Sequence, residues 1–129
     1  MTTSQPDRPA PDFNLQRRTK RFALQIVEFC ESLPHDEACG VLRRQLLRCG
    51  TSVGANYRAA CRAKSKADFI SKMGNVEEEA DESGYWLELL VDAGKVSPRQ
   101  ASSLLEEANE LVAIAVASIN TARRNGPER

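Results

Sequence analysis

Aromatic residues, histidine and long apolar runs are scarce in this chain of 129 residues. Aromatic residues make up 5% of it, and its one histidine is His35. The longest apolar run, Leu111 to Ala117, is far too short to cross a bilayer. Formal net charge is zero, so no global electrostatic attraction to nucleic acid or to a membrane surface is expected. The sequence therefore excludes a membrane-spanning helix and favours helices over sheets.

The four cysteines include no C-x-x-C pair, the spacing most typical of zinc and redox sites. Cys30 and Cys49 fall on apolar helix positions, so they are interpreted as small, reduced core residues. The N-terminal residues show no apolar segment followed by a cleavage site. We expect a cytoplasmic protein.

The periodicity of apolar residues predicts an all-α, antiparallel up-down-up-down four-helix bundle over residues 14–125. Asn14 is the expected N-cap of the first helix, which ends before Pro34. The second and third helices are predicted at 38–63 and 66–94, with a turn near residues 64–66. Ser65 followed by Asp68 resembles a capping box at the start of the third helix. Ser97 is the expected N-cap of the last helix, and Pro98 its first residue. Residues 1–13 are predicted to be a disordered tail and 126–129 a short C-terminal one.

The two central helices carry small and apolar residues at alternating steps of three and four. This heptad step keeps one seam facing a partner helix. The predicted seams are Leu42, Leu46, Cys49, Val53, Asn56 and Ala60 on the second helix, and Phe69, Met73, Val76, Ala80, Ser83, Leu87, Leu90 and Gly94 on the third.

The second helix also carries an arginine stripe that faces away from its seam. Its members Arg44, Arg48, Arg58 and Arg62 lie within about 80° of one another and extend over about 27 Å. Lys64 and Lys66 follow at the turn. One interpretation is pairing with the acidic stretch from Val76 to Glu110, within the chain or between subunits. The second interpretation is contact with a nucleic-acid backbone or another acidic partner, and the third is a plain solvated face.

The third helix carries an apolar strip beside or opposite its seam: Tyr85, Trp86, Leu89 and Ala93. Exposed apolar clusters usually mark an interface, which favours self-association. The alternative is a broad core face that already covers Trp86. These four residues are the candidate oligomer interface.

Four polar residues lie near the predicted core: Ser52, Asn56, Glu79 and Ser83. Because buried polar groups need partners, we expect Asn56 to bond across to Glu79 or Ser83. The chain has no Glu-x-x-His pair, no glycine-rich phosphate loop and no nucleophile–base–orienter set. We therefore predict no catalytic residue, no metal site, no cofactor and no small-molecule substrate.

The chain resembles the bacterial four-helix-bundle family encoded in intervening sequences of the large-subunit ribosomal RNA gene, from about Leu15 to Ile119. The resemblance is carried by Leu33-Pro34 with Glu37, Gln45-Leu46, Ser52-Val53, Ala55-Asn56, Ser65 with Asp68-Phe69, and Glu82-Ser83 with Trp86-Leu87-Glu88-Leu89. Many family members read Asn-Ile-Ala-Glu-Gly where this chain has Asn56 followed by Tyr57-Arg58-Ala59-Ala60. No role attached to that glutamate is therefore expected here.

The resemblance implies a small cytosolic bundle that assembles into a homopentameric ring without known catalysis. A relative in the same superfamily is the accessory protein of diversity-generating retroelements, a basic ring that binds nucleic acid and a reverse transcriptase. The expected function is thus a non-enzymatic, homo-oligomeric (pentameric) interaction scaffold. The alternative is a nucleic-acid-binding accessory protein that uses the arginine stripe to bind RNA or DNA.

Overall fold

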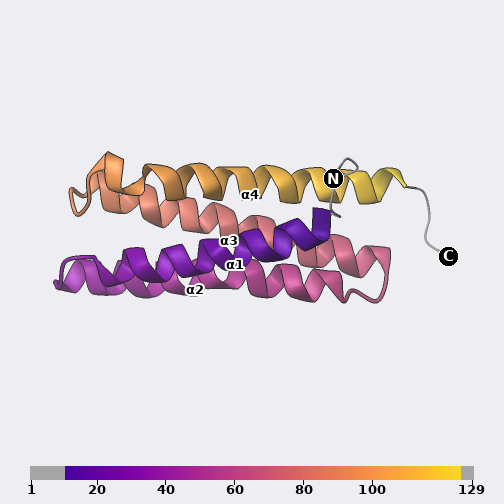
Figure 1. Ribbon diagram of the computed structural model, residues 1–129, viewed down its shortest axis with the longest axis horizontal. Coiled ribbons are helices and arrows are strands. Elements are labelled where there is room, and N and C mark those ends of the chain that lie inside the picture. The colour runs from indigo at the N-terminus through magenta and orange to yellow at the C-terminus, as the bar shows by residue number, and fades with distance from the viewer. Residues whose placement is uncertain (1–10, 126–129) are drawn as a thin grey trace, which may run out of the picture.

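The computed structural model describes residues 11–125, which form four helices connected by short loops. Helix α1 spans Pro11–Glu31, α2 Glu37–Cys61, α3 Lys66–Asp92 and α4 Pro98–Arg124. They run lengthwise and alternate in direction, as the path of the colours in Figure 1 shows. The predicted all-α, up-down-up-down bundle is confirmed.

Helix α1 begins at Pro11, so the prediction that Asn14 is its N-cap is wrong. Proline suits the first turn of a helix because its φ is preset and it lacks an amide hydrogen that would go unpaired there. Three residues assigned to the N-terminal tail are thus helical. The rest of that tail, residues 1–10, and the C-terminal tail, 126–129, lie outside the described residues.

The other three helices each begin at a side chain that caps them. The Asp36 carboxylate accepts a hydrogen bond from the Cys39 amide at 2.8 Å, which holds the pKa of Asp36 below its usual value. The Ser65 hydroxyl accepts one from the Asp68 amide at 3.0 Å. Ser97 and Gln100 bond to each other's backbone amides, forming a capping box in front of Pro98. The predicted caps at Ser65 and Ser97 are confirmed.

Gly94 is not the last member of the α3 seam, as the heptad pattern suggested. Helix α3 ends at Asp92, and Gly94 adopts φ +73°, a left-handed conformation that costs little without a Cβ. The Lys95 amide then donates to the Leu90 carbonyl at 3.0 Å, and the Gly94 amide to the Val91 carbonyl at 2.9 Å. This pair of bonds is a Schellman motif, which ends the helix and starts the connection to α4.

At the end of α1, hydrogen bonds come from a side chain of the next helix. The guanidinium of Arg43 on α2 donates to the carbonyl of Cys30 at 3.0 Å and to those of Leu33 and Pro34 at 3.3 and 3.0 Å. The Cys30 carbonyl also accepts a bond from the Leu33 amide at 3.3 Å, and a cation suits the negative end of the helix dipole. Arg43 therefore stabilises the α1–α2 connection.

The core lies between the apolar faces of the helices and follows the predicted seams. The seam residues from Met73 to Leu90 on α3 are buried, as are Leu46, Cys49, Val53 and Ala60 on α2. Phe22 and Ile26 supply the centre of α1. Leu42, Asn56 and Phe69, near the ends of the seams, are half-buried.

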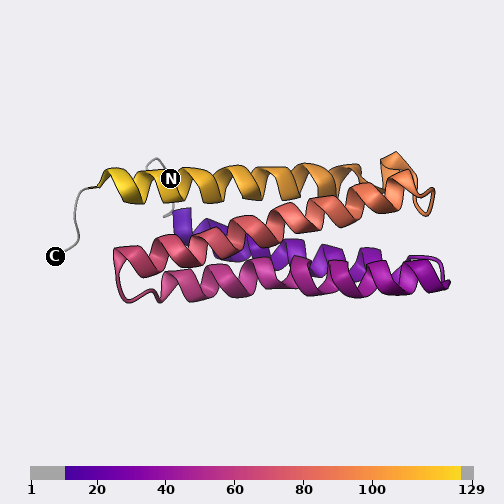
Figure 2. The same cartoon turned by 180° about the vertical axis from the view of Figure 1, so that it is seen from behind.

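Helix α1 packs against α2 along its length and touches α4 at few positions. The Arg18 guanidinium bridges this looser side: it meets Glu107 on α4 through two bonds of 2.6 and 2.9 Å and also pairs with Glu110. The hydrogen bonds to Glu107 raise the pKa of Arg18 above its usual range. Figures 1 and 2 show that, within the described residues, α1 begins short of the α2–α3 turn. No helix within residues 11–125 is both long and apolar enough to traverse a bilayer.

Candidate interaction surfaces

The arginine stripe lies on the outer surface of α2. Arg44, Arg48 and Arg58 are exposed there, and Arg62 is exposed at the C-cap. Arg48 pairs with Glu79 at 3.4 Å and with Glu82, both on α3. No ion pair joins Arg44, Arg58 or Arg62 to another residue within 11–125. Pairing within the chain, the first of the three interpretations of the stripe, thus applies to Arg48.

Lys64 and Lys66, the two lysines that follow the arginine stripe at the turn, flank the N-cap Ser65. Lys64 is exposed, and its backbone amide donates to the Asp68 carboxylate at 3.0 Å. Lys66 is half-buried and is the first residue of α3. The Asp68 carboxylate also accepts a bond of 2.5 Å from Lys72, which lowers the pKa of Asp68. The turn is therefore basic on its outside and stabilised by a carboxylate.

The apolar strip on α3 is divided between the core and the surface. Tyr85 is 55% exposed, and Ala93 is exposed at the C-cap. Trp86 is half-buried against the core, and its indole Nε1 donates to the Glu82 carboxylate at 3.0 Å. The Tyr85 and Trp86 rings meet edge to face, with centroids 5.0 Å apart. Leu89 is half-buried. The core thus covers part of Trp86, whereas Tyr85 remains outside.

Sequence reasoning missed Val41 on α2, which is 45% exposed. Arg48 and Glu82 face each other across the outer edge of α2 and α3. Val41 lies seven residues before Arg48, and Leu89 seven residues after Glu82. Since seven residues make two helical turns, Val41 and Leu89 face each other two turns closer to the α3–α4 loop. We name Val41, Tyr85, Trp86 and Leu89 the apolar face.

Two further exposed apolar side chains were not predicted. Leu24 on α1 is 59% exposed, and Val116 on α4 is 37% exposed. Both lie outside the buried stripes of their helices, where a lone apolar residue forms no pattern in the sequence. Isolated exposed apolar residues are common in monomeric proteins.

The polar set does not form the predicted network. Asn56 donates to the Ser52 carbonyl at 2.9 Å, and the Ser52 hydroxyl donates to the Arg48 carbonyl at 2.6 Å, both within α2. The expected bond from Asn56 to Glu79 or Ser83 is therefore wrong. The link between the helices comes instead from buried Ser83, whose hydroxyl lies 3.3 Å from the Cys49 sulfur and 2.8 Å from the Glu79 carbonyl. Asn56 is only half-buried, so it had less need of a partner across the interface.

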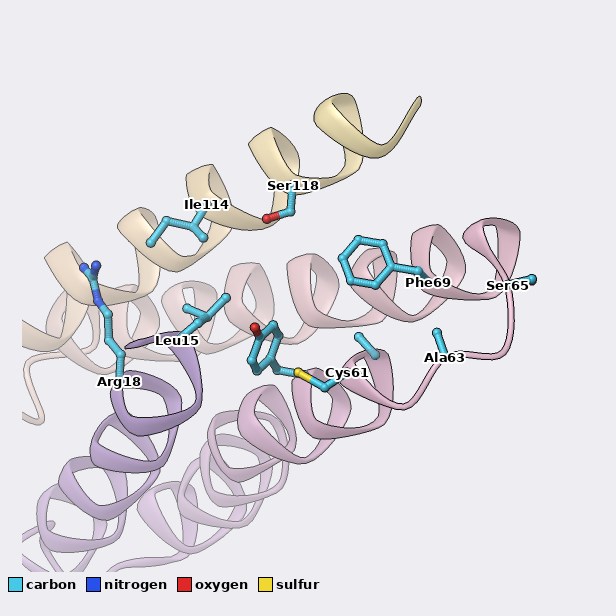
Figure 3. A pocket seen from close by; sticks show the side chains of 10 residues that line it. Leu15, Arg18, Cys61, Ala63, Ser65, Phe69, Ile114 and Ser118 are labelled. Carbon is cyan, nitrogen blue, oxygen red and sulfur yellow. The ribbon is translucent and has the colours of Figure 1, made fainter. Parts of the chain in front are cut away.

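A cavity of about 650 Å³ opens where α1 stops short of the α2–α3 turn. Its lining includes the apolar or aromatic side chains of Leu15, Tyr57, Phe69 and Ile114, and Figure 3 shows Phe69 on α3 and Ile114 on α4. Among the described residues that line it there is no histidine or carboxylate.

The cysteines and the potential metal ligands show no reactive arrangement in the described part of the chain. Cys30, Cys39 and Cys49 are buried, and burial raises the pKa of the Cys30 thiol to about 11. A thiol with such a pKa stays protonated near neutral pH and is a poor nucleophile. Within residues 11–125, no three side chains of the metal-binding types His, Cys, Asp and Glu come together.

Comparison with known proteins agrees with this architecture. Residues 12–117 match the family described as 23S rRNA-intervening sequence protein. The fold is similar to the crystal structure of a protein of unknown function from the S23 ribosomal protein family of Bacteroides thetaiotaomicron VPI-5482. That likeness has a TM-score of 0.76 and 36% sequence identity, and it covers 81% of this chain and 96% of the other. No protein of curated function matches the chain. The four-helix bundle is therefore a member of the 23S rRNA-intervening sequence protein family.

Proposed function

We propose that the protein is a non-catalytic scaffold that assembles from several identical copies, five in the ring that the family resemblance implies. The observation that carries this proposal is the apolar face. Its exposed members are Tyr85 on α3 and Val41 on α2, and its half-buried members, Trp86 and Leu89, lie on α3. A contiguous apolar surface with a central aromatic residue is typical of a protein interface. The proposal assigns no residue a catalytic role.

Placing charges on the apolar face is expected to dissociate the assembly. The double variant Val41→Glu with Tyr85→Glu puts two carboxylates into the interface while leaving the core intact, because both positions are largely exposed. Losing interface anchors of this kind costs roughly 2–4 kcal/mol, so the dissociation constant should rise about 30-fold or more. Size-exclusion chromatography with light scattering would measure the particle mass across a dilution series.

Val116→Glu is the matched control, since Val116 is partly exposed but lies on α4, away from the apolar face. It should assemble like the wild type. Circular dichroism would verify that all variants remain helical. A double variant that keeps the wild-type mass at every concentration would rule out this surface as the interface.

A second candidate function is nucleic-acid binding through the arginine stripe. It is favoured by Arg44, Arg58 and Arg62, which are exposed and form no ion pair within the described residues. The stripe offers no interleaved aromatic residue for base stacking, so the expected ligand is a phosphate backbone. The zero net charge of the chain makes this binding dependent on the local stripe alone.

A salt titration tests this second function. Affinity for RNA and DNA duplexes and single strands should fall steeply with salt. Replacing Arg44, Arg58 and Arg62 together with glutamine should reduce the slope of log K against log salt by about 2–3 units. Arg48→Gln is the control, because Arg48 is engaged with Glu79 and Glu82, and it should change the slope little. Absence of binding at low salt would remove the candidate.

A further inference from the structure

We infer that the protein binds an anionic amphiphile, a molecule with an extended apolar chain and one carboxylate, at the α2–α3-turn end of the bundle. This binding activity uses a different surface from the apolar face and does not depend on the proposed scaffold. Three observations carry it: the apolar lining of the cavity, its continuation along α4, and the cations at its outer end.

The cavity that begins at Leu15 and Tyr57 continues into a second hollow along α4. This second hollow has a volume of about 430 Å³. Phe69, Ile114 and Ser118 line both hollows, which therefore meet at these three residues. The other residues that line the second hollow are Ala117, Thr121, Ala122 and Asn125. We name the two hollows together the end groove.

The end groove has the size and the lining of a site for an apolar molecule. Small-molecule sites usually measure about 300–1,000 Å³ and present mainly apolar and aromatic side chains with a few polar groups. Figure 3 shows Leu15 of α1 at one side of the cavity and Phe69 of α3 at the other. Along α4 the lining extends from Ile114 to Asn125, about 16 Å at 1.5 Å per residue. A hollow drawn out along a helix suits an acyl chain better than a compact ring system.

The inner end of the groove does not attract an anion. Arg18 is the charged residue among the described residues that line it. Its guanidinium is already bonded to Glu107 at 2.6 and 2.9 Å and also pairs with Glu110. Because two carboxylates neutralise this cation, the inner end favours the apolar part of a ligand.

The outer end of the groove is cationic. The guanidinium of Arg124 donates to the Thr121 hydroxyl at 3.4 Å, which places it at the rim, and it forms no ion pair within residues 11–125. Residues 60–66 and 114–125, which supply most of the lining, contain five basic residues and no acidic one. Asp68, which lies close along the chain, already accepts hydrogen bonds from two lysines. A carboxylate at this end therefore lies in positive surroundings.

These charges orient the ligand, with the end of its chain near Leu15 and Tyr57 and its carboxylate near Arg124. Residues 1–10, which precede α1, are the competing occupant. They contain one long apolar side chain, Met1, and therefore match the apolar lining less well than an acyl chain does.

Calorimetric titration of the full chain with octanoate and decanoate, each below its micelle concentration, tests the class of ligand. Decanoate should bind about tenfold more tightly than octanoate, because it buries two more methylene groups. Decan-1-ol should bind about fivefold more weakly than decanoate, and decylammonium more weakly still, since neither pairs with Arg124. A chain that binds none of them would leave the groove to another occupant, such as residues 1–10, and overturn the inference. Equal binding of decylammonium and decanoate would overturn it too.

Two variants of α4 locate the bound ligand. Ser118→Trp fills the junction of the two hollows, so the dissociation constant of decanoate should rise about tenfold or more. Ala113→Trp is the matched control, because Ala113 is exposed on α4 and lines neither hollow, and it should bind like the wild type. Circular dichroism would verify that both remain helical. Wild-type affinity in a folded Ser118→Trp variant would contradict binding in the end groove.

Arg124→Gln tests the carboxylate end without altering the apolar lining. It should remove the difference in affinity between decanoate and decan-1-ol while leaving the binding of decan-1-ol unchanged. Arg99→Gln is its control, because Arg99 is exposed at the opposite end of α4 and should preserve the difference. If Arg124→Gln also preserved it, the assignment of the anionic end would be wrong.

Cys61 gives a readout from the cavity itself, since it lines the cavity and is exposed, whereas the other three cysteines are buried. Decanoate at about ten times its dissociation constant should slow the labelling of Cys61 by a maleimide up to about tenfold. In a Cys61→Ser background, the thiol introduced by Ala113→Cys should be labelled at the same rate with and without decanoate. Calorimetric binding without protection of Cys61 would place the ligand elsewhere and overturn the inference.

Discussion

Replacing Phe22 with alanine should lower the free energy of unfolding by about 3–5 kcal/mol. Phe22 is completely buried at the centre of α1, and removing its ring deletes apolar contacts and leaves a cavity that the surrounding helices fill only partly. The loss is large compared with the total stability of about 5–15 kcal/mol that is typical of native proteins. Urea unfolding followed by circular dichroism would measure it.

Gln25→Ala is the matched control for this change. Gln25 lies three residues further along α1 on its exposed side, so the same helix is altered without a cavity. Its effect should stay within about 0.5 kcal/mol. If Phe22→Ala were as mild as Gln25→Ala, the packing of α1 against the other helices would be wrong.

The second large effect is expected at Gly50, where α1 and α2 approach most closely. A Cβ added to Gly50 would lie 2.9 Å from two carbons of the Ile26 side chain, closer than real Cβ atoms come. Gly50→Ala should therefore destabilise the protein by about 1–3 kcal/mol, since Ile26 is fully buried and branched at Cβ and has little room to move. This overpacking outweighs the gain in helix propensity, which is about 1 kcal/mol.

Gly74→Ala separates packing from propensity. Gly74 lies inside α3, and a Cβ there would meet no atom within 4 Å. Only the propensity gain remains, so Gly74→Ala should stabilise the protein by up to about 1 kcal/mol. Thermal unfolding of both variants should thus show shifts of opposite sign. Shifts of the same sign would mean that α1 does not contact α2 at Gly50.

The architecture was predictable from sequence because the helix seams repeat at heptad spacing and because Ser65 and Ser97 are strong N-cap signals. An N-cap depends only on the residues next to it, and a seam depends only on one helix and the neighbour that it packs against. Gly94 shows the limit of periodicity: it fits the heptad spacing, yet glycine after the last turn ends a helix more readily than it extends one. Asn14 shows the same limit at an N-terminus, where Pro11 is the earlier start.

The candidate surfaces were harder to predict because they depend on how two helices are aligned. Val41 has no signal of its own, and only the Arg48–Glu82 pair shows that it faces Leu89. The bonds of Asn56 likewise depend on its half-burial, which the seam pattern does not reveal. A shallow groove between α1 and α2, lined by Ala23, Thr51 and Gly54 among others, depends on the spacing of the two helices, information that neither helix carries alone.

The mass of the wild-type particle in solution tests the central claim most directly. One chain has a mass of 14.3 kDa. Sedimentation equilibrium at micromolar concentration should give an integral multiple of that mass, five-fold for the proposed ring. A particle of 14.3 kDa at every concentration would contradict the account, because Tyr85 and Val41 would then have no partner to cover them.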